Sequence, residues 1–211
     1  ETIRYFTKTG DSLQGTLMYP ANFDPNKKYP MLVYIYEKLS SRINAFVPPS
    51  DYGYSGFNAL KYTTNGYFVL YPDIKYSLQD PGVSALHSVS AAVNKALETE
   101  HIDKERLGLI GHSFGGYETT FIVTQTDLFK VAVAGAAVTD LTSHYHSVGW
   151  NGKRPEMWRY EGQQWRMGDS YYDSKTAYHR NSPWHHIEAL NTPLLLWAGK
   201  EDLQVHWTQS V

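Results

Sequence analysis

The chain has 211 residues, with 21 acidic and 19 basic side chains and a formal net charge of −2. This balance excludes a net-basic nucleic-acid binder, and no apolar run approaches the roughly 20 residues that a membrane-spanning helix needs. The absence of cysteine excludes disulfides, thiol catalysis and zinc sites built on cysteine. An apolar content of 42% is typical of a globular protein that can fill a core.

Short β-type segments alternate with helical patterns along the chain. Residues 2–6 and 13–19 flank the turn signal Gly10-Asp11 and predict a hairpin. Five further strands are predicted, mainly from continuous apolar runs, at residues 31–36, 66–71, 106–110, 130–136 and 192–198. Three helices are predicted, at residues 57–63, 84–99 and 115–126. This alternation predicts a single α/β domain over residues 1–211, with a mainly parallel, doubly wound sheet.

Residues 139–185 have no clear strand. They carry four of the six tryptophans, together with several tyrosines and histidines. We expect this segment to form helices and loops over one end of the sheet.

The segment Gly111-His-Ser-Phe-Gly115 matches the pattern Gly-x-Ser-x-Gly. A buried strand leads into it and an apolar helix follows, which is the context of an elbow that exposes a nucleophilic serine. The glycines let strand and helix approach closely, and a helix N-terminus favours developing negative charge. Ser113 is therefore the predicted nucleophile, and the backbone N–H of Phe114 the predicted oxyanion donor. The alternative is a serine-glycine turn that only begins a helix.

In such a hydrolase an acid and then a histidine follow the nucleophile along the chain. Asp202, which comes just after the strand at 192–198, is the predicted acid. Glu201 and Asp140 are weaker rivals, and a loop or helix-capping carboxylate is the alternative for Asp202.

None of the nine histidines fits the role of catalytic base. His206 follows Asp202 by only four residues, which is too close for it to bridge Asp202 and Ser113. The other eight precede Asp202, and their spacings do not resemble the helical zinc-binding pair. No metal or other cofactor is expected. The simplest account places the base beyond Val211, in a region with at least one more strand and helix.

Taken together, these residues resemble the C-terminal catalytic domain of the prolyl oligopeptidase family, near its dipeptidyl peptidase IV and acylaminoacyl peptidase branches. The likeness runs almost from end to end and is far more specific than Gly-x-Ser-x-Gly alone. It is carried by residues 5–20, 28–36, 66–73, 102–107, 111–117, 181–183 and 192–202. The resemblance implies an α/β-hydrolase fold that lacks its last strand and helix, and a family β-propeller that is absent before Glu1.

Residue by residue, the resemblance implies Ser113 as nucleophile, Asp202 as triad acid and Tyr36 as a second oxyanion donor beside the N–H of Phe114. It also implies walls for the pocket that holds the residue before the scissile bond: Phe114, Tyr117, Val138, Leu141 and Tyr145. The chain departs from the family at residues 37–39, Glu-Lys-Leu, where the family has a small residue or glycine followed by Gly-Pro.

The function implied by the resemblance is that of a serine peptidase which cleaves short peptides through an acyl-enzyme. Without its histidine, the 211-residue fragment should be inactive or nearly so. The alternatives are an esterase on the same fold and a non-catalytic hydrolase-fold binding module. The expected partner is a peptide, not a nucleic acid or a membrane, and a periplasmic or secreted location is favoured over the cytoplasm. If the last strand is missing, the strand at 192–198 exposes unpaired backbone groups, which predicts a homo-oligomer through this sheet edge.

Overall fold

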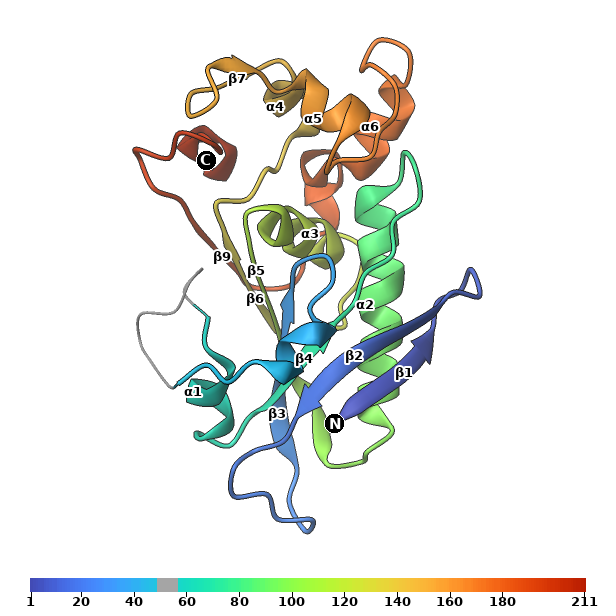
Figure 1. Ribbon diagram of the computed structural model, residues 1–211, viewed down its shortest axis with the longest axis vertical. Helices are drawn as coiled ribbons and strands as arrows, with labels where there is room; N and C mark the ends of the chain where they lie inside the picture. Colours follow the sequence, from blue (N-terminus) through green and yellow to red (C-terminus); the bar gives the residue numbers. More distant parts are fainter. Residues whose placement is uncertain (49–56) are drawn as a thin grey trace.

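The computed structural model describes residues 1–48 and 57–211. Its centre is a seven-stranded sheet in the order β1-β2-β4-β3-β5-β6-β9 (Figure 1). The strands are β1 (Thr2–Phe6), β2 (Ser12–Met18), β3 (Tyr29–Ile35), β4 (Phe68–Pro72), β5 (Ile102–His112), β6 (Val131–Gly135) and β9 (Leu194–Trp197). From β4 to β9 the neighbours run parallel, whereas β1 and β2 form an antiparallel hairpin that joins the sheet at β4. The predicted hairpin and mainly parallel sheet are therefore confirmed.

The apolar runs form strands that are covered on both faces. Successive side chains of a strand point to opposite faces, so Val33 and Ile35 of β3 enter one core layer and Tyr34 enters the other. The first layer packs against α2 (Pro81–Leu97), whose buried face carries Val89 and Val93. The second layer includes the start of α1 (Ala59–Thr63). Helices on both faces are what a doubly wound sheet requires.

Residues 139–185 lie over the carboxyl ends of the parallel strands, as Figure 1 shows. Their helices are α4 (Leu141–Tyr145), α5 (Met157–Gly162) and α6 (Lys175–Asn181), followed by the 3-10 helix Pro183–Ala189. They also include a two-stranded antiparallel ribbon of β7 (Val148–Gly149) and β8 (Arg154–Pro155), which the sequence did not predict. Strands of two residues have no alternation that a pattern could detect.

An aromatic cluster fastens this segment to the sheet. The rings of Tyr160 and Trp165 stack with centroids 4.6 Å apart, and Trp165 meets the edge of Phe114 at 5.1 Å. All three side chains are buried. Because aromatic side chains bury large apolar areas, this cluster gives a segment with little regular structure a defined position above the sheet.

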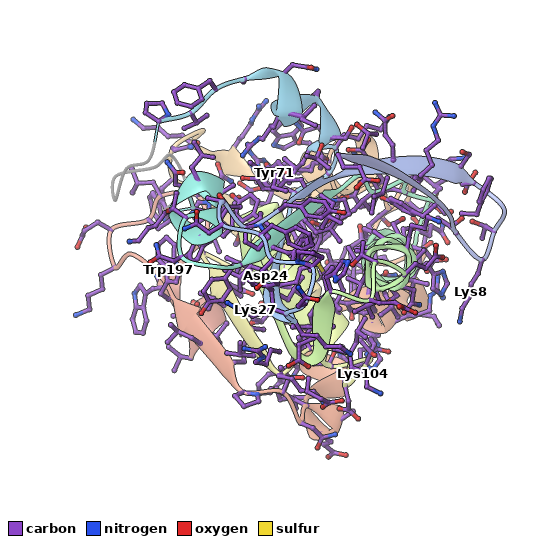
Figure 2. The ribbon with its side chains drawn as sticks, turned by 90° about the horizontal axis from the view of Figure 1, so that it is seen from below. Lys8, Asp24, Lys27, Tyr71, Lys104 and Trp197 are labelled. Atoms are coloured by element: carbon purple, nitrogen blue, oxygen red, sulfur yellow. The ribbon has the colours of Figure 1, made fainter. Side chains whose placement is uncertain are left out.

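Strand β9 is an edge strand of the described sheet and pairs only with β6 there. Its side chains Leu195 and Trp197 are 59% and 45% exposed, and Trp197 lies toward the outer edge of the molecule in Figure 2. Self-association through this strand stays a prediction. Within residues 1–48 and 57–211, no helix is both long enough and apolar enough to span a membrane.

Candidate active site

Ser113 lies between the last residue of β5 and the first residue of α3 (Phe114–Val123). Its backbone angles are φ 57° and ψ −119°, a conformation that residues other than glycine rarely adopt. The N–H of Ser113 donates to the carbonyl of Gly135 (2.8 Å), and its carbonyl accepts from the N–H of Tyr117 (3.0 Å). These two hydrogen bonds hold the strained residue in the strand–turn–helix elbow that the sequence predicted.

Two glycines allow the close backbone contacts of the elbow, because neither has a Cβ atom. A Cβ on Gly111 would lie 2.0 Å from the carbonyl oxygen of Gly115, and a Cβ on Gly115 would lie 2.2 Å from the carbonyl oxygen of Ile35. The same position on Gly115 is 3.5 Å from the Tyr36 ring. The first turn of α3 therefore sits directly against the end of β3, with Tyr36 beside it.

Two candidate oxyanion donors lie at this junction. The Tyr36 hydroxyl accepts a hydrogen bond from Nε2 of Gln164 (3.1 Å). A phenol oxygen accepts through its lone pairs and donates through its single O–H, so this contact leaves the O–H available. The N–H of Phe114 is one of the first N–H groups of α3, which have no partner inside the helix. The oxyanion roles of Tyr36 and Phe114 stay predictions.

The structure gives a physical account of the departure from the family after Tyr36. Glu37 has φ 48°, in the left-handed region that favours glycine. Its carbonyl accepts from the N–H of Ile74 (2.7 Å), and its carboxylate pairs with Arg166 (2.9 Å). These contacts hold a glutamate in a turn for which glycine is better suited.

A buried carboxyl group lies farther along α3. Glu118 is fully buried and hydrogen-bonds with the hydroxyl of Tyr76, whose ring lies 4.2 Å from the guanidinium carbon of Arg166. Burial raises the pKa of Glu118 to about 8, while Tyr76 and Arg166 lower it and Glu37 raises it further. Glu118 is therefore largely protonated at neutral pH and links α3 to Tyr76, in the segment between β4 and α2.

A small cavity opens at Ser113. Its volume is about 10 Å³, roughly the space of one water molecule. Its lining residues are Ser113, Phe114, Val138, His144, Arg159, Gln164, Trp165, Gln204 and Val205. Residues 139–185 and the loop after β9 therefore both contribute to its walls.

The five predicted pocket residues divide into two groups. Phe114 and Val138 line the cavity at Ser113. Tyr117, Leu141 and Tyr145 do not line it, because their side chains are fully or almost fully buried in the aromatic cluster. The structure thus places these three behind the cavity wall, and their contact with substrate stays a prediction.

Polar side chains close one wall of the cavity. Nη2 of Arg159 donates to Oε1 of Gln204 (3.3 Å), and both residues contact the buried carboxylate of Glu156. Nε of Arg159 lies 3.3 Å from Oε2 of Glu156, and Nε2 of Gln204 donates to its Oε1 (3.1 Å). Gly149 leaves room for this carboxylate, because a Cβ there would lie 2.0 Å from Oε1. Sequence reasoning missed these side chains, since no motif or periodic pattern contains them.

Asp202 lies in the loop after β9. Its Oδ1 accepts from the N–H groups of Gln204 (2.8 Å) and Val205 (3.0 Å), whereas its Oδ2 has no hydrogen bond to the described residues. Because Gln204 and Val205 line the cavity with Ser113, the predicted acid is held close to the predicted nucleophile. Burial lowers the pKa of His112, and the charge of Asp202 opposes this shift.

The rival acids have other roles or are exposed. Asp140 is the N-cap of α4, and its carboxylate accepts from the N–H groups of Thr142 and Ser143, each at 3.1 Å. Such a cap stabilises a helix by about 1 kcal/mol. Glu201 is exposed in a turn.

In residues 1–48 and 57–211, no histidine hydrogen-bonds to the hydroxyl of Ser113 or to the carboxylate of Asp202. His206 caps the 3-10 helix Trp207–Ser210, with its Nδ1 2.8 Å from Oγ1 of Thr208. His144 lines the cavity, but burial lowers its pKa to about 4 and keeps the ring neutral. The base beyond Val211 stays a prediction.

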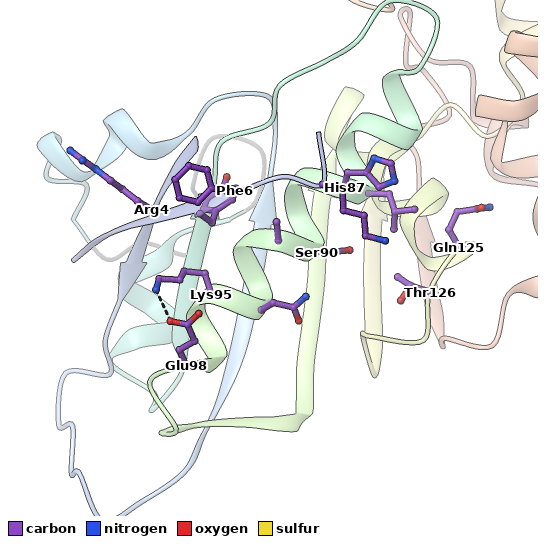
Figure 3. Close-up of a pocket in the computed structure, with 13 residues that line it drawn as sticks. Arg4, Phe6, His87, Ser90, Lys95, Glu98, Gln125 and Thr126 are labelled. Atoms are coloured by element: carbon purple, nitrogen blue, oxygen red, sulfur yellow. Dashed lines mark hydrogen bonds and ion pairs between the residues drawn. The ribbon is translucent and has the colours of Figure 1, made fainter. Parts of the chain in front are cut away.

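A wider hollow of about 590 Å³ lies away from the elbow, between β1 and α2 (Figure 3). Its walls carry Arg4, Phe6 and His87, together with Lys95 and Glu98, which pair at 2.5 Å. None of the predicted catalytic residues lines it. The smaller cavity is therefore the candidate site, because it is lined by Ser113, a serine held on a strained backbone. The described residues contain no cluster of three or more histidine, aspartate or glutamate side chains that could hold a metal ion.

Two curated relatives match nearly the whole chain. The uncharacterized peptidase YuxL of Bacillus subtilis is 30% identical over 215 residues, which cover 96% of this chain and 30% of that protein. Dipeptidyl-peptidase 5 of Porphyromonas endodontalis is 23% identical over 222 residues, which cover 97% of this chain and 30% of that protein. This chain therefore spans about a third of the length of these relatives.

The fold is shared with solved peptidase structures. An acylaminoacyl peptidase in complex with Z-Gly-Gly-Phe-chloromethyl ketone matches with a TM-score of 0.79 at 21% identity, over 100% of this chain and 33% of that one. The expected α/β-hydrolase fold is thus confirmed. The sequence profile of the Prolyl oligopeptidase family matches residues 76–211. With the match to YuxL, that profile shows that the chain belongs to the prolyl oligopeptidase family.

Proposed function

We propose that this chain forms the catalytic part of a serine peptidase that hydrolyses short peptides through an acyl-enzyme. The observation that carries the proposal is Ser113, which is held on a strained backbone at the start of α3 and faces a small cavity. Family membership, with relatives named as peptidases, supports peptide hydrolysis.

In the proposed reaction, Oγ of Ser113 attacks the scissile carbonyl carbon while a histidine accepts the serine proton. Asp202 orients that histidine through Oδ2, the oxygen that the loop backbone does not use. The N–H of Phe114 and the O–H of Tyr36 donate to the oxyanion. The histidine then protonates the leaving amine, and water releases the acyl group from Ser113.

We expect this histidine to follow Asp202 and to lie beyond Val211, since His206 is engaged by Thr208. For this reason we expect residues 1–211 alone to show little or no hydrolysis. Binding and oxyanion stabilisation provide the residual rate when a triad member is missing.

A fluorophosphonate probe tests the nucleophile directly. The protein is expressed together with the coding sequence that follows Val211 in its gene. We expect covalent labelling that is lost in Ser113→Ala and kept in Ser12→Ala, whose side chain is exposed on β2. A folded extended protein that does not react with the probe would contradict the proposal. Matched peptide and ester substrates then distinguish a peptidase from an esterase.

A further inference from the structure

The cavity at Ser113 is the space that would lie beside an acyl group on this serine. Ser113 and Phe114 both line it, so its size bears on which side chain could be placed next to the acyl carbon. Its volume of about 10 Å³ is close to the space of one water molecule. A hydrogen atom, a methyl group or a hydroxymethyl group matches this space, and a branched or aromatic side chain does not.

The fixed walls of the cavity come from the core. Val138 and Trp165 are 2% and 3% exposed and belong to the cluster that packs α3 against residues 139–185. Val138 and Trp165 could move away from the cavity only if the aromatic cluster were disrupted. The remaining polar wall therefore decides how far the cavity can enlarge.

The polar wall is held by Glu156. Its carboxylate is almost fully buried, pairs with Arg159 and accepts from Gln204, and Gly149 gives it room. Moving Arg159 out of the cavity would leave this carboxylate without its cation in a desolvated site, which is strongly unfavourable. Glu156, which contacts both Arg159 and Gln204, therefore holds these two side chains in the position that narrows the cavity.

We propose that Arg159 and Gln204, held by Glu156, restrict the residue before the scissile bond to glycine, alanine or serine. This inference rests on the proposed peptidase function and adds its substrate class. A leucine or phenylalanine at that position would have to displace Arg159 and Gln204 from Glu156.

A panel of peptides that differ only in the residue before the scissile bond tests the proposal. We expect the extended wild-type protein to show a kcat/KM at least about tenfold higher for alanine than for leucine, since one extra methylene in a hydrophobic pocket can change the rate by about 10- to 200-fold. Gln204→Ala and Arg159→Ala should each raise the leucine-to-alanine ratio about tenfold or more. Arg4→Ala is the matched control, because Arg4 is exposed on β1 and does not line the cavity.

Gln204→Ala keeps the backbone N–H that donates to Asp202, so this variant decides the matter if Arg159→Ala does not fold. A wild-type protein that cleaves after leucine as well as after alanine would overturn the inference, and so would an unchanged ratio in the folded variants. If Ser113 is labelled but size selection is absent, only this inference fails. If both labelling and hydrolysis are absent, the proposed function fails, and this inference fails with it.

Discussion

The elbow and the polar wall of the cavity meet at Ser113, but they are held in different ways. The elbow is fixed by backbone groups, through the hydrogen bond from Ser113 to Gly135 and the close approach of Gly115 to Ile35. The wall is fixed by side chains that can be replaced one at a time. Changes at the elbow should therefore affect the whole fold or the whole reaction, whereas changes at the wall should have graded effects on substrate choice.

The largest effect is expected from Gly115→Ala. The new Cβ would clash with the carbonyl oxygen of Ile35, which belongs to a central strand and cannot move alone. We expect the free energy of unfolding to fall by about 3 kcal/mol, or folding to fail. Chemical denaturation measures the change. Gly162→Ala is the control, because outside its own helix backbone and chain neighbours no atom of the described residues lies within 4 Å of its Cβ position. Equal stability of the two variants would show that the elbow tolerates a methyl group.

A second, smaller effect is expected at Tyr36, the predicted oxyanion donor whose hydroxyl accepts a hydrogen bond from Gln164. Tyr36→Phe removes the O–H and should lower kcat about 100-fold with little change in KM. Gln164→Glu would accept the Tyr36 proton and turn it away from the oxyanion, so it should lower kcat more than Gln164→Leu does. Steady-state kinetics of the extended protein measures these changes, with the exposed Tyr172→Phe as control. A larger loss in the leucine variant would show that Gln164 acts by packing instead.

The smallest effect concerns stability and pH at Glu118. The pKa of this carboxyl is about 8 in the folded protein, against an ordinary value of 4.5. The folded state therefore holds more protons between these values, and the contribution of Glu118 to stability is lost as pH rises from about 5 to 8. Glu118→Gln has no proton to lose in this range, so its stability should fall less between pH 5 and pH 8 than that of the wild type.

Denaturant titrations at pH 5, 6.5 and 8 measure this decline, with Glu188→Gln as the exposed control. An identical pH slope in wild type and Glu118→Gln would mean that Glu118 is not protonated in the folded state. Helix α3 would then carry a buried charge stabilised by Tyr76 and Arg166.

The part of the structure that the sequence could predict is the part whose signals are local. All five residues of β4 are buried, and this strand was recognised from its apolar run. Ser113 was identified because its glycines and the preceding strand are adjacent to it in sequence. Arg159, Gln164 and Gln204 could not be identified in this way, because their positions depend on how residues 139–185 and the loop after β9 pack in three dimensions. The aromatic cluster that positions the first of these segments has no helical or strand period.

Four residues of the loop after β9, residues 202–205, have two structural roles. The N–H groups of Gln204 and Val205 fix one oxygen of Asp202, and the side chains of the same two residues form part of the cavity. Under the proposed mechanism, an insertion or deletion between positions 202 and 205 would therefore alter both proton transfer and substrate choice in a single genetic step. Arg159 has no hydrogen bond or ion pair with Asp202 among the described residues, so position 159 can vary without that linkage. Mutant libraries that seek new substrate ranges should vary position 159 together with its partner Glu156 and keep the length of this loop constant.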